Sequence, residues 1–123
     1  MVHFDTNYLV AAIRTGSPQA TQLDAWLAAK ETVGMSAVAW AEFLCGPVSA
    51  RDEVTARQMF RQVEAFSGQD AEMAARLFNK TGRRSKTLAD CMIAAVAMRC
   101  SAKLATVNAP DFQPFVPHGL ILA

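Results

Sequence analysis

Three carboxylates of this 123-residue chain stand inside runs of apolar residues, so a fold must either pair them with bases or hold them at a shared site. They are Asp5 in Val-His-Phe-Asp-Thr-Asn-Tyr-Leu-Val, Glu42 in Val-Ala-Trp-Ala-Glu-Phe-Leu-Cys, and Asp90 in Leu-Ala-Asp-Cys-Met-Ile-Ala-Ala-Val-Ala-Met. An ionised carboxylate is costly to remove from water unless it is paired or bound to a metal. No Lys or Arg lies within three residues of any of them. Either distant bases neutralise these acids, or the fold gathers them around a cation.

Composition and charge narrow the class of protein. At 52% apolar residues the chain can build one hydrophobic core, and its length predicts a single domain over residues 1–123. A net charge of +1 does not by itself predict a polyanion partner. Three cysteines without a Cys-x-x-Cys pair argue against a disulfide framework and a zinc site. The apolar runs are too short and too charged for a membrane span, and residues 1–5 lack signal-peptide features, so we expect a cytoplasmic protein.

Short strand signals alternate with helix signals along the chain. We expect strands at 1–5, 32–36, 103–107 and 120–122, with a weak one within 63–67, and helices over 6–14, 18–30, 37–45, 50–64, 68–82 and 87–101. In the helix over 50–64 the buried side is predicted to hold Val54, Met59, Phe60 and Val63. The alternation is typical of an α/β fold in which helices flank a short parallel sheet of four to five strands.

The expected strand ends give the acids a common location. Open α/β sheets place their sites beyond the carboxyl ends of the strands. Asp5 follows the first strand, Asn108 and Asp111 follow the strand at 103–107, and Glu42 and Asp90 lie in helices that could aim them at the same crevice. The short polar residues Thr6, Asn7, Thr106 and Asn108 are turn formers or would orient water and carboxylates there.

Each of these residues also has a structural interpretation. Asp5 fits a helix N-cap, and Thr87-Leu-Ala-Asp90 resembles a capping box. Asp111 fits a turn after Pro110, whereas Glu42 lies mid-helix, where no capping role exists. Arg83, Arg84 and Lys86 either solvate a loop or contact phosphates. The two histidines, His3 and His118, are expected to be structural or surface residues. The other carboxylates with polar neighbours are expected to be solvated: Glu31, Asp52, Glu53, Glu64, Asp70 and Glu72.

Four motifs together resemble the PIN-domain ribonucleases, and most of all the VapC-type toxins of bacterial toxin–antitoxin pairs. They are Phe4-Asp5-Thr6-Asn7, Ala41-Glu42-Phe43-Leu44-Cys45-Gly46, Gly82-Arg83-Arg84, and the stretch from Asp90-Cys-Met-Ile-Ala-Ala-Val-Ala to Leu104-Ala-Thr-Val-Asn108-Ala-Pro-Asp111-Phe112. In this order they cover nearly the whole chain. The resemblance departs at Ser101, where the family often has Gly.

The resemblance implies a PIN-like three-layer sandwich and a metal-dependent endoribonuclease. Asp5, Glu42 and Asp90 would then bind the metal, with the fourth position at Asn108 or Asp111, which we assign to Asp111. Such hard oxygen ligands suit Mg²⁺ or Mn²⁺. Arg83, Arg84 and Lys86 would hold phosphates of the RNA substrate, and the products would carry a 5′-phosphate and a 3′-hydroxyl. The implied partners are a VapB-type antitoxin and a second copy in a homodimer, with Tyr8, Trp26 or Trp40 as candidate contacts for the antitoxin helix.

Three other classes share the α/β pattern. A receiver domain needs an acidic pair after the first strand, and a haloacid-dehalogenase-like phosphatase needs Asp-x-Asp there, whereas this chain has Asp5-Thr6-Asn7. A non-catalytic binding module of the same class has no need of the three acids.

Overall fold

A parallel sheet forms the centre of the molecule. The structure, a computed structural model, describes residues 1–60 and 63–123. Within them the strands β1 (Val2–Phe4), β2 (Val33–Met35) and β3 (Lys103–Ala105) pair in the order β2-β1-β3. His3 lies opposite Gly34 on one side and Leu104 on the other. The buried His3 ring needs that glycine, because a Cβ at Gly34 would lie 3.0 Å from its Nε2 and Cδ2 atoms.

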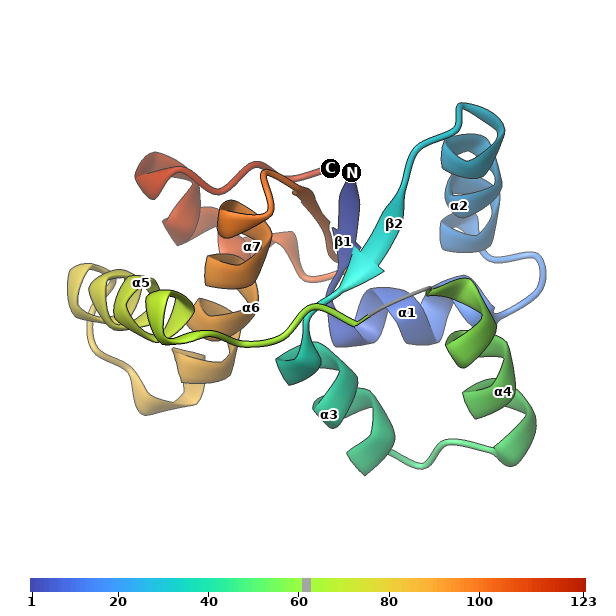
Figure 1. The fold of residues 1–123 in the computed structure, drawn as a ribbon, viewed down its shortest axis with the longest axis horizontal. Helices are drawn as coiled ribbons and strands as arrows, with labels where there is room; N and C mark the ends of the chain where they lie inside the picture. Colours follow the sequence, from blue (N-terminus) through green and yellow to red (C-terminus); the bar gives the residue numbers. More distant parts are fainter. Residues whose placement is uncertain (61–62) are drawn as a thin grey trace.

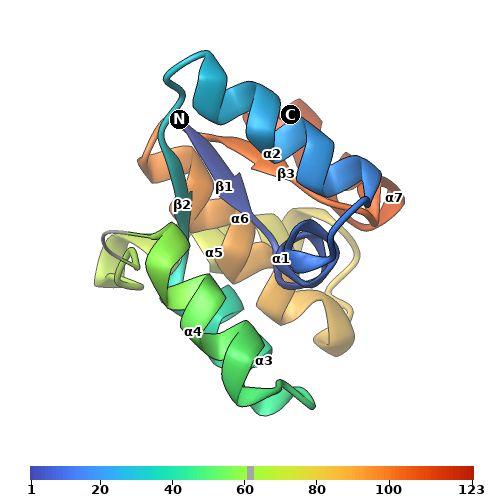
Figure 2. The ribbon, with the colours of Figure 1, turned by 90° about the vertical axis from the view of Figure 1, so that its right-hand side faces the viewer.

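Helices cover both faces of this sheet, as the α/β pattern predicts. Figures 1 and 2 show one group, α1 (Thr6–Ile13), α2 (Pro18–Ala28), α3 (Ala37–Cys45) and α4 (Ala50–Met59), gathered on one side of the strands. On the other side lie α5 (Gly68–Lys80), α6 (Leu88–Arg99), α7 (Ala109–Phe112) and the 3-10 segments η1 (Ser85–Thr87) and η2 (Gln113–His118). Among the described residues, no helix has the length and apolar character needed to cross a membrane.

Serine caps start three of the helices where the sequence predicts them. The Oγ atoms of Ser17, Ser36 and Ser67 accept hydrogen bonds from backbone amides three residues later. Each cap satisfies one of the amides that a helix start leaves without a partner. These side chains fix the entry points of α2, α3 and α5.

An aromatic cluster packs on one face of the sheet, and the apolar helix α6 packs on the other. Phe4 is fully buried, and its ring lies 5.0 Å from that of Tyr8, 6.1 Å from Trp26 and 5.8 Å from Phe60, measured between centroids. On the opposite face α6 is buried along its middle, at Cys91 and from Ile93 to Ala97, as its apolar sequence predicts. Both layers therefore hold β1 rigidly, and β1 leads directly to Asp5.

The sheet has fewer strands than expected. The structure shows three strands in its described part, not four to five. The predicted edge strands are reduced to single parallel bridges, Ser36 with Glu64 and Leu104 with Leu122. One bridge at each edge still satisfies backbone groups of β2 and β3, so the chain returns to the sheet without forming a ladder.

Helices α4 and α7 also differ from the sequence-based prediction. The helix predicted over 50–64 ends at Met59, and residues 61–62 lie outside the described residues. Val54, predicted to be buried, is 53% exposed, because α4 turns Ala56 inward instead. The predicted turn at 108–111 is a short helix, α7, with proline in its first turn.

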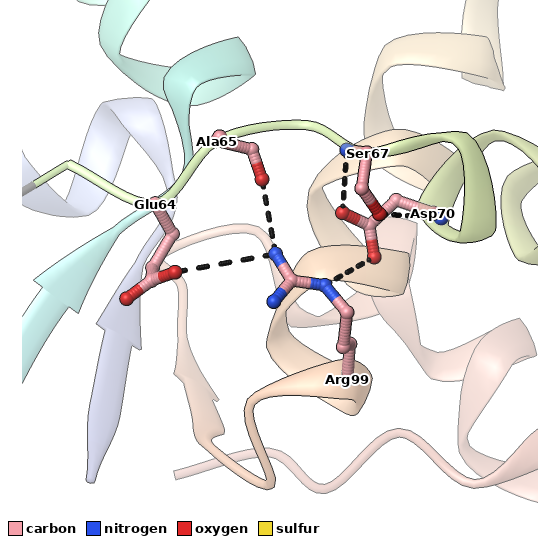
Figure 3. Close-up of polar contacts among 5 residues, drawn as sticks. All are labelled: Glu64, Ala65, Ser67, Asp70 and Arg99. Atoms are coloured by element: carbon pink, nitrogen blue, oxygen red, sulfur yellow. Dashed lines mark hydrogen bonds and ion pairs between the residues drawn. The ribbon is translucent and has the colours of Figure 1, made fainter.

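Outside the sheet, the largest difference from the sequence-based expectation concerns Asp70, which was expected to be solvated but is buried. It is 1% exposed and forms a true capping box with Ser67: the Ser67 amide donates to Asp70 Oδ2 at 2.9 Å, and the Asp70 amide donates to Ser67 Oγ at 3.2 Å. Arg99, from the end of α6, donates to Asp70 Oδ1 at 2.8 Å and to the Ala65 carbonyl at 3.0 Å. Figure 3 shows how this arginine joins α6 to the segment that leads into α5, with Glu64 at 4.0 Å.

Candidate active site

Most of the candidate side chains line one cavity at the carboxyl ends of the strands. The cavity has a volume of about 290 Å³. Its lining contains Asp5, Thr6, Asn7, Glu42, Asp90, Ile93, Asn108, Asp111 and Phe112. The four acids come from four separate places: the end of β1, the middle of α3, the first turn of α6, and α7. The fold thus brings together residues that are up to 106 positions apart in the sequence, from Asp5 to Asp111.

Asp5 is the most buried acid of the cavity, at 4% exposed. It is the N-cap of α1, and its Oδ1 accepts a hydrogen bond from the Tyr8 amide at 3.0 Å. The Thr106 hydroxyl donates to its Oδ2 at 2.5 Å. Burial raises the pKa of Asp5, although both hydrogen bonds oppose that shift. The N-cap interpretation and the site interpretation of Asp5 are therefore compatible, because the carboxylate caps the helix and lines the cavity.

Thr106 is itself fixed by the loop that follows β3. Its Oγ1 accepts a hydrogen bond from the Asn108 amide at 2.9 Å while donating to Asp5. This pair of bonds joins the first strand to the last part of the cavity wall. Thr106 does not line the cavity, so it acts on the site through Asp5 and Asn108, which do.

Glu42 reaches the cavity from the exposed side of α3. Its Oε1 accepts a hydrogen bond of 2.9 Å from the Thr6 hydroxyl, which also contacts the Ala39 carbonyl at 3.3 Å. Thr6 therefore holds one carboxylate oxygen of Glu42 near the start of α1. The remaining exposure of Glu42 leaves its side chain room to rotate.

Asp90 has no capping role in this structure. Thr87 makes no side-chain hydrogen bond to the start of α6, and its hydroxyl instead donates to the Arg84 carbonyl at 2.8 Å. The capping-box interpretation of Asp90 is thus wrong. Burial raises the pKa of Asp90 to about 6, and the negative charges of the other three acids add to this shift. In the described part of the chain, no Lys or Arg forms an ion pair with any of the four.

The basic residues predicted to contact phosphates lie outside the cavity. Arg83, Arg84 and Lys86 belong to the exposed segment between α5 and α6, which ends in η1. That segment leads into the turn of α6 that carries Asp90.

Two apolar residues of the cavity were missed by the sequence analysis. Ile93 and Phe112 are almost fully buried and form part of its wall. The available signal was the helical spacing, since Ile93 lies three residues after Asp90 and therefore on the same side of α6. Phe112 follows Asp111 within α7, where the sequence predicts a turn.

The chemistry of this cavity fits a hard divalent cation. Its polar lining consists of carboxylate, amide and hydroxyl oxygens, which are the ligands of Mg²⁺ and Mn²⁺. Over residues 1–60 and 63–123, no three His, Cys, Asp or Glu side chains lie close enough together to enclose an ion directly. Mg²⁺ usually keeps several waters and takes only one or two carboxylates, so a wide acidic cavity suits it better than a closed cage.

Comparison with known proteins identifies relatives over almost the entire length. The family model described as PIN domain matches residues 2–112. No functionally curated protein matches the chain. Among solved structures, a toxin–antitoxin complex from Klebsiella pneumoniae shares 25% identity, with a TM-score of 0.72 over 91% of this chain and 90% of that one.

Two further structures share the fold at lower identity. VapBC2 from Rickettsia felis, bound to a DNA fragment from their promoter, has 22% identity and a TM-score of 0.74 over 100% of this chain and 98% of that one. VapC20 from Mycobacterium tuberculosis, a Sarcin-Ricin loop cleaving toxin, has 17% identity and a TM-score of 0.69 over 100% and 98%.

Proposed function

This chain belongs to the PIN-domain family, and from that premise we propose that it is a metal-dependent endoribonuclease that hydrolyses RNA phosphodiester bonds. The observation that carries the proposal is the convergence of Asp5, Glu42, Asp90 and Asp111 on one cavity without a basic partner in the described residues. Structural carboxylates that line a cavity would normally be paired or solvated separately. The family assignment also removes the receiver and phosphatase alternatives.

A Mg²⁺ or Mn²⁺ ion would be held by these carboxylates, of which Asp5 is the most buried. When bound, such an ion activates water and stabilises negative charge on a phosphodiester. The chain's own residues prepare the place. Thr106 and the Tyr8 amide fix both oxygens of Asp5, and Thr6 orients Glu42. Buried Ile93 and Phe112 form an apolar wall that limits water on one side.

The substrate is RNA in a single-stranded or loop form. Single-stranded RNA can be bent so that one phosphate enters a small cavity while its bases splay outward. Arg83, Arg84 and Lys86 would contact phosphates that flank the one being cleaved. Cleavage would leave a 5′-phosphate and a 3′-hydroxyl, and such an enzyme would act where RNA is abundant, in the cytoplasm.

The biological role that fits this activity is that of a toxin neutralised by a VapB-type antitoxin. Support comes from the relatives, which include a toxin–antitoxin complex at 25% identity over nine-tenths of both chains. The partner would be an amphipathic antitoxin segment, and the toxin would form a homodimer. Tyr8 is buried in the core, so of the expected antitoxin contacts Trp26 and Trp40 keep partly exposed rings.

The test is an RNA cleavage assay with single carboxylate-to-amide variants. Purified wild type, Asp5→Asn and Asp90→Asn are incubated with structured RNAs in Mg²⁺, Mn²⁺ or EDTA. We expect the wild type to cleave only with a divalent ion, and each variant to lose at least about a hundredfold in rate, because charge stabilisation at the phosphate is lost.

Asp24→Asn is the matched control, because Asp24 is an exposed carboxylate on α2 outside the cavity. It should cleave like the wild type. Cleavage that persists in EDTA or in both site variants would refute the proposed mechanism. A wild type that binds Mn²⁺ yet cleaves no RNA would favour the non-catalytic binding module.

A further inference from the structure

Positive charge is concentrated in one segment of this nearly neutral chain. Between Glu72 and Asp90 there are five basic residues and no acidic one: Arg76, Lys80, Arg83, Arg84 and Lys86. The chain has 12 Lys and Arg and 11 Asp and Glu, so the remainder holds 7 cations against 11 acids and carries a net charge of −4. A domain with this distribution presents a local positive field that its net charge conceals.

All five side chains of this basic strip are exposed. Within residues 1–60 and 63–123, none of them forms an ion pair, whereas Arg57 and Arg99 do. Exposed cations without intramolecular partners are available to a polyanion. The strip is therefore not occupied with holding the fold together.

The strip has an ordered backbone. Arg76 and Lys80 stand one turn apart on α5, about 6 Å along the helix axis. After α5, the Arg83 amide donates to the Phe78 carbonyl at 3.0 Å, and before α6 the Thr87 hydroxyl donates to the Arg84 carbonyl at 2.8 Å. The backbone between these anchors is thus held in place before any ligand binds, which reduces the entropy lost on binding.

Arg83 follows α5 in a left-handed turn. Its φ of 55° lies in the left-handed region, which is uncommon for a residue other than glycine. Gly82 before it has a φ of 98°, at no steric cost. Lys30 and Ser101 share this backbone conformation, so the turn at Arg83 shapes the segment and is not by itself a sign of function.

The strip leads along the chain to the acidic cavity. Its last residue, Lys86, is four positions before Asp90, and Figure 1 shows the segment running from the end of α5 down the left-hand side to the start of α6. On the basis of the proposed ribonuclease function, we propose that one flank of a single-stranded RNA leaves the cavity over the start of α6 and continues along α5, with Lys80 and Arg76 binding phosphates distant from the cleaved one. The protein then selects RNAs with an extended single-stranded flank.

The test separates binding from cleavage. Fluorescence anisotropy in EDTA measures the affinity for randomised single-stranded RNAs of increasing length at several salt concentrations. The variant is Arg76→Gln/Lys80→Gln, which keeps good helix formers in α5. We expect it to bind long RNA about tenfold more weakly and to lower the slope of log K against log salt by about 1.4, since each phosphate contact on a single strand contributes about 0.7. The shortest RNAs should bind both proteins equally.

Lys30→Gln/Lys103→Gln is the matched control, because it removes two exposed cations at the opposite rim of the sheet, Lys30 shortly before β2 and Lys103 at the start of β3. It should keep the wild-type slope. Equal salt slopes for the wild type and both variants would contradict the proposal. Equal losses of RNA affinity in the two variants would contradict it as well. A loss confined to anionic lipid vesicles would assign the surface to membranes and also overturn it. Retained strip binding in a chain that cleaves no RNA would refute the proposed function alone.

Discussion

Asp70 and Asp90 occupy the same place in two neighbouring helices, yet they have opposite environments. Each is the third residue of its helix and follows a hydroxyl residue by three positions, Ser67 or Thr87. In α5 the pattern forms a capping box, and Arg99 completes it. In α6 the hydroxyl points elsewhere, and the carboxylate faces the acidic cavity.

The pKa values of these two acids differ accordingly. Burial would raise the pKa of Asp70, but the hydrogen bonds from Arg99 and Ser67 outweigh it, so this pKa lies below its usual value. Burial raises the pKa of Asp90 to about 6, and its acidic neighbours add to the effect. One carboxylate is satisfied by the fold itself, whereas the other is satisfied only by an external cation or a proton. This contrast distinguishes a structural acid from one that we propose to be functional.

Replacing Asp70 should have the largest effect on stability. Asp70→Ala removes the capping box and leaves Arg99 without its main partner, so we expect a loss of about 2–3 kcal/mol in the free energy of unfolding. Urea denaturation at neutral pH measures it. Glu72→Ala, on the exposed surface of α5, is the control and should change stability little. If Asp70→Ala loses no more stability than Glu72→Ala, the ion pair between Asp70 and Arg99 in Figure 3 does not stabilise the fold.

Replacing Asp90 should have the opposite effect on the stability of the metal-free protein. Between pH 3.8 and about 6 the folded state keeps a proton on Asp90 that the unfolded state has lost, so stability falls as pH rises through that window. Asp90→Asn should therefore raise the free energy of unfolding by about 1–2 kcal/mol at pH 7.5, after allowance for partial exposure, and leave it unchanged at pH 3.5.

Thermal unfolding in EDTA across this pH range checks the prediction. Asp70→Asn is the informative companion, because the pKa of Asp70 is lowered and its contribution is present above pH 3.8 and lost on acidification. Under identical conditions at pH 7.5, Asp90→Asn should thus stabilise the metal-free protein and Asp70→Asn should destabilise it. A clear destabilisation by Asp90→Asn at pH 7.5 would restore a structural role for Asp90.

Asp5 lies between these extremes, since it is hydrogen-bonded without a cation. Thr106→Val removes the donor to Oδ2 and the acceptor for the Asn108 amide, so we expect a loss of about 1 kcal/mol in stability. Weaker Mn²⁺ binding by calorimetry should accompany it, because the orientation of Asp5 is no longer fixed. Thr106→Ser keeps the hydroxyl and should restore both properties, whereas failure of the serine variant to do so would contradict a positioning role.

The smallest expected effect on stability comes from replacing the hydroxyl residues at the starts of α5 and α6. Ser67→Ala should destabilise the protein by about 1 kcal/mol because it removes a cap. Thr87→Ala should cost about 0.5 kcal/mol or less, since its hydroxyl bonds only exposed backbone at the start of α6. The comparison of unfolding free energies tests whether similar sequence patterns differ in energy as they differ in geometry. Equal losses would indicate that Thr87 caps α6 in solution.

The sequence predicted the features that depend on local chemistry. Ser17, Ser36 and Ser67 mark helix starts through contacts within three residues, and β1 and α6 follow from their apolar patterns. The edge strands could not be predicted, because whether Glu64 and Leu122 form a ladder or a single bridge depends on how distant segments approach β2 and β3. The burial of Asp70 depends in the same way on Arg99, 29 residues further along the chain.

The candidate site shows the same division. The acids could be singled out because apolar neighbours make a solvated carboxylate unexpected, and strand ends gave them a common rim. The roles of Thr6 and Thr106 as donors to Glu42 and Asp5 depend on tertiary contacts across 36 and 101 residues. Sequence could name these threonines as polar neighbours, but only the structure pairs each with its carboxylate.

The central position of β1 has a consequence for synthesis on the ribosome. β1, which leads into Asp5, is made about a hundred residues before its second neighbour, β3, and before the Thr106 hydroxyl. A nascent polypeptide therefore has no assembled acidic cavity until β3 and α7 have emerged. Under the proposed activity, the translating ribosome is protected from the enzyme that it is making, and products of premature termination before Thr106 are inert.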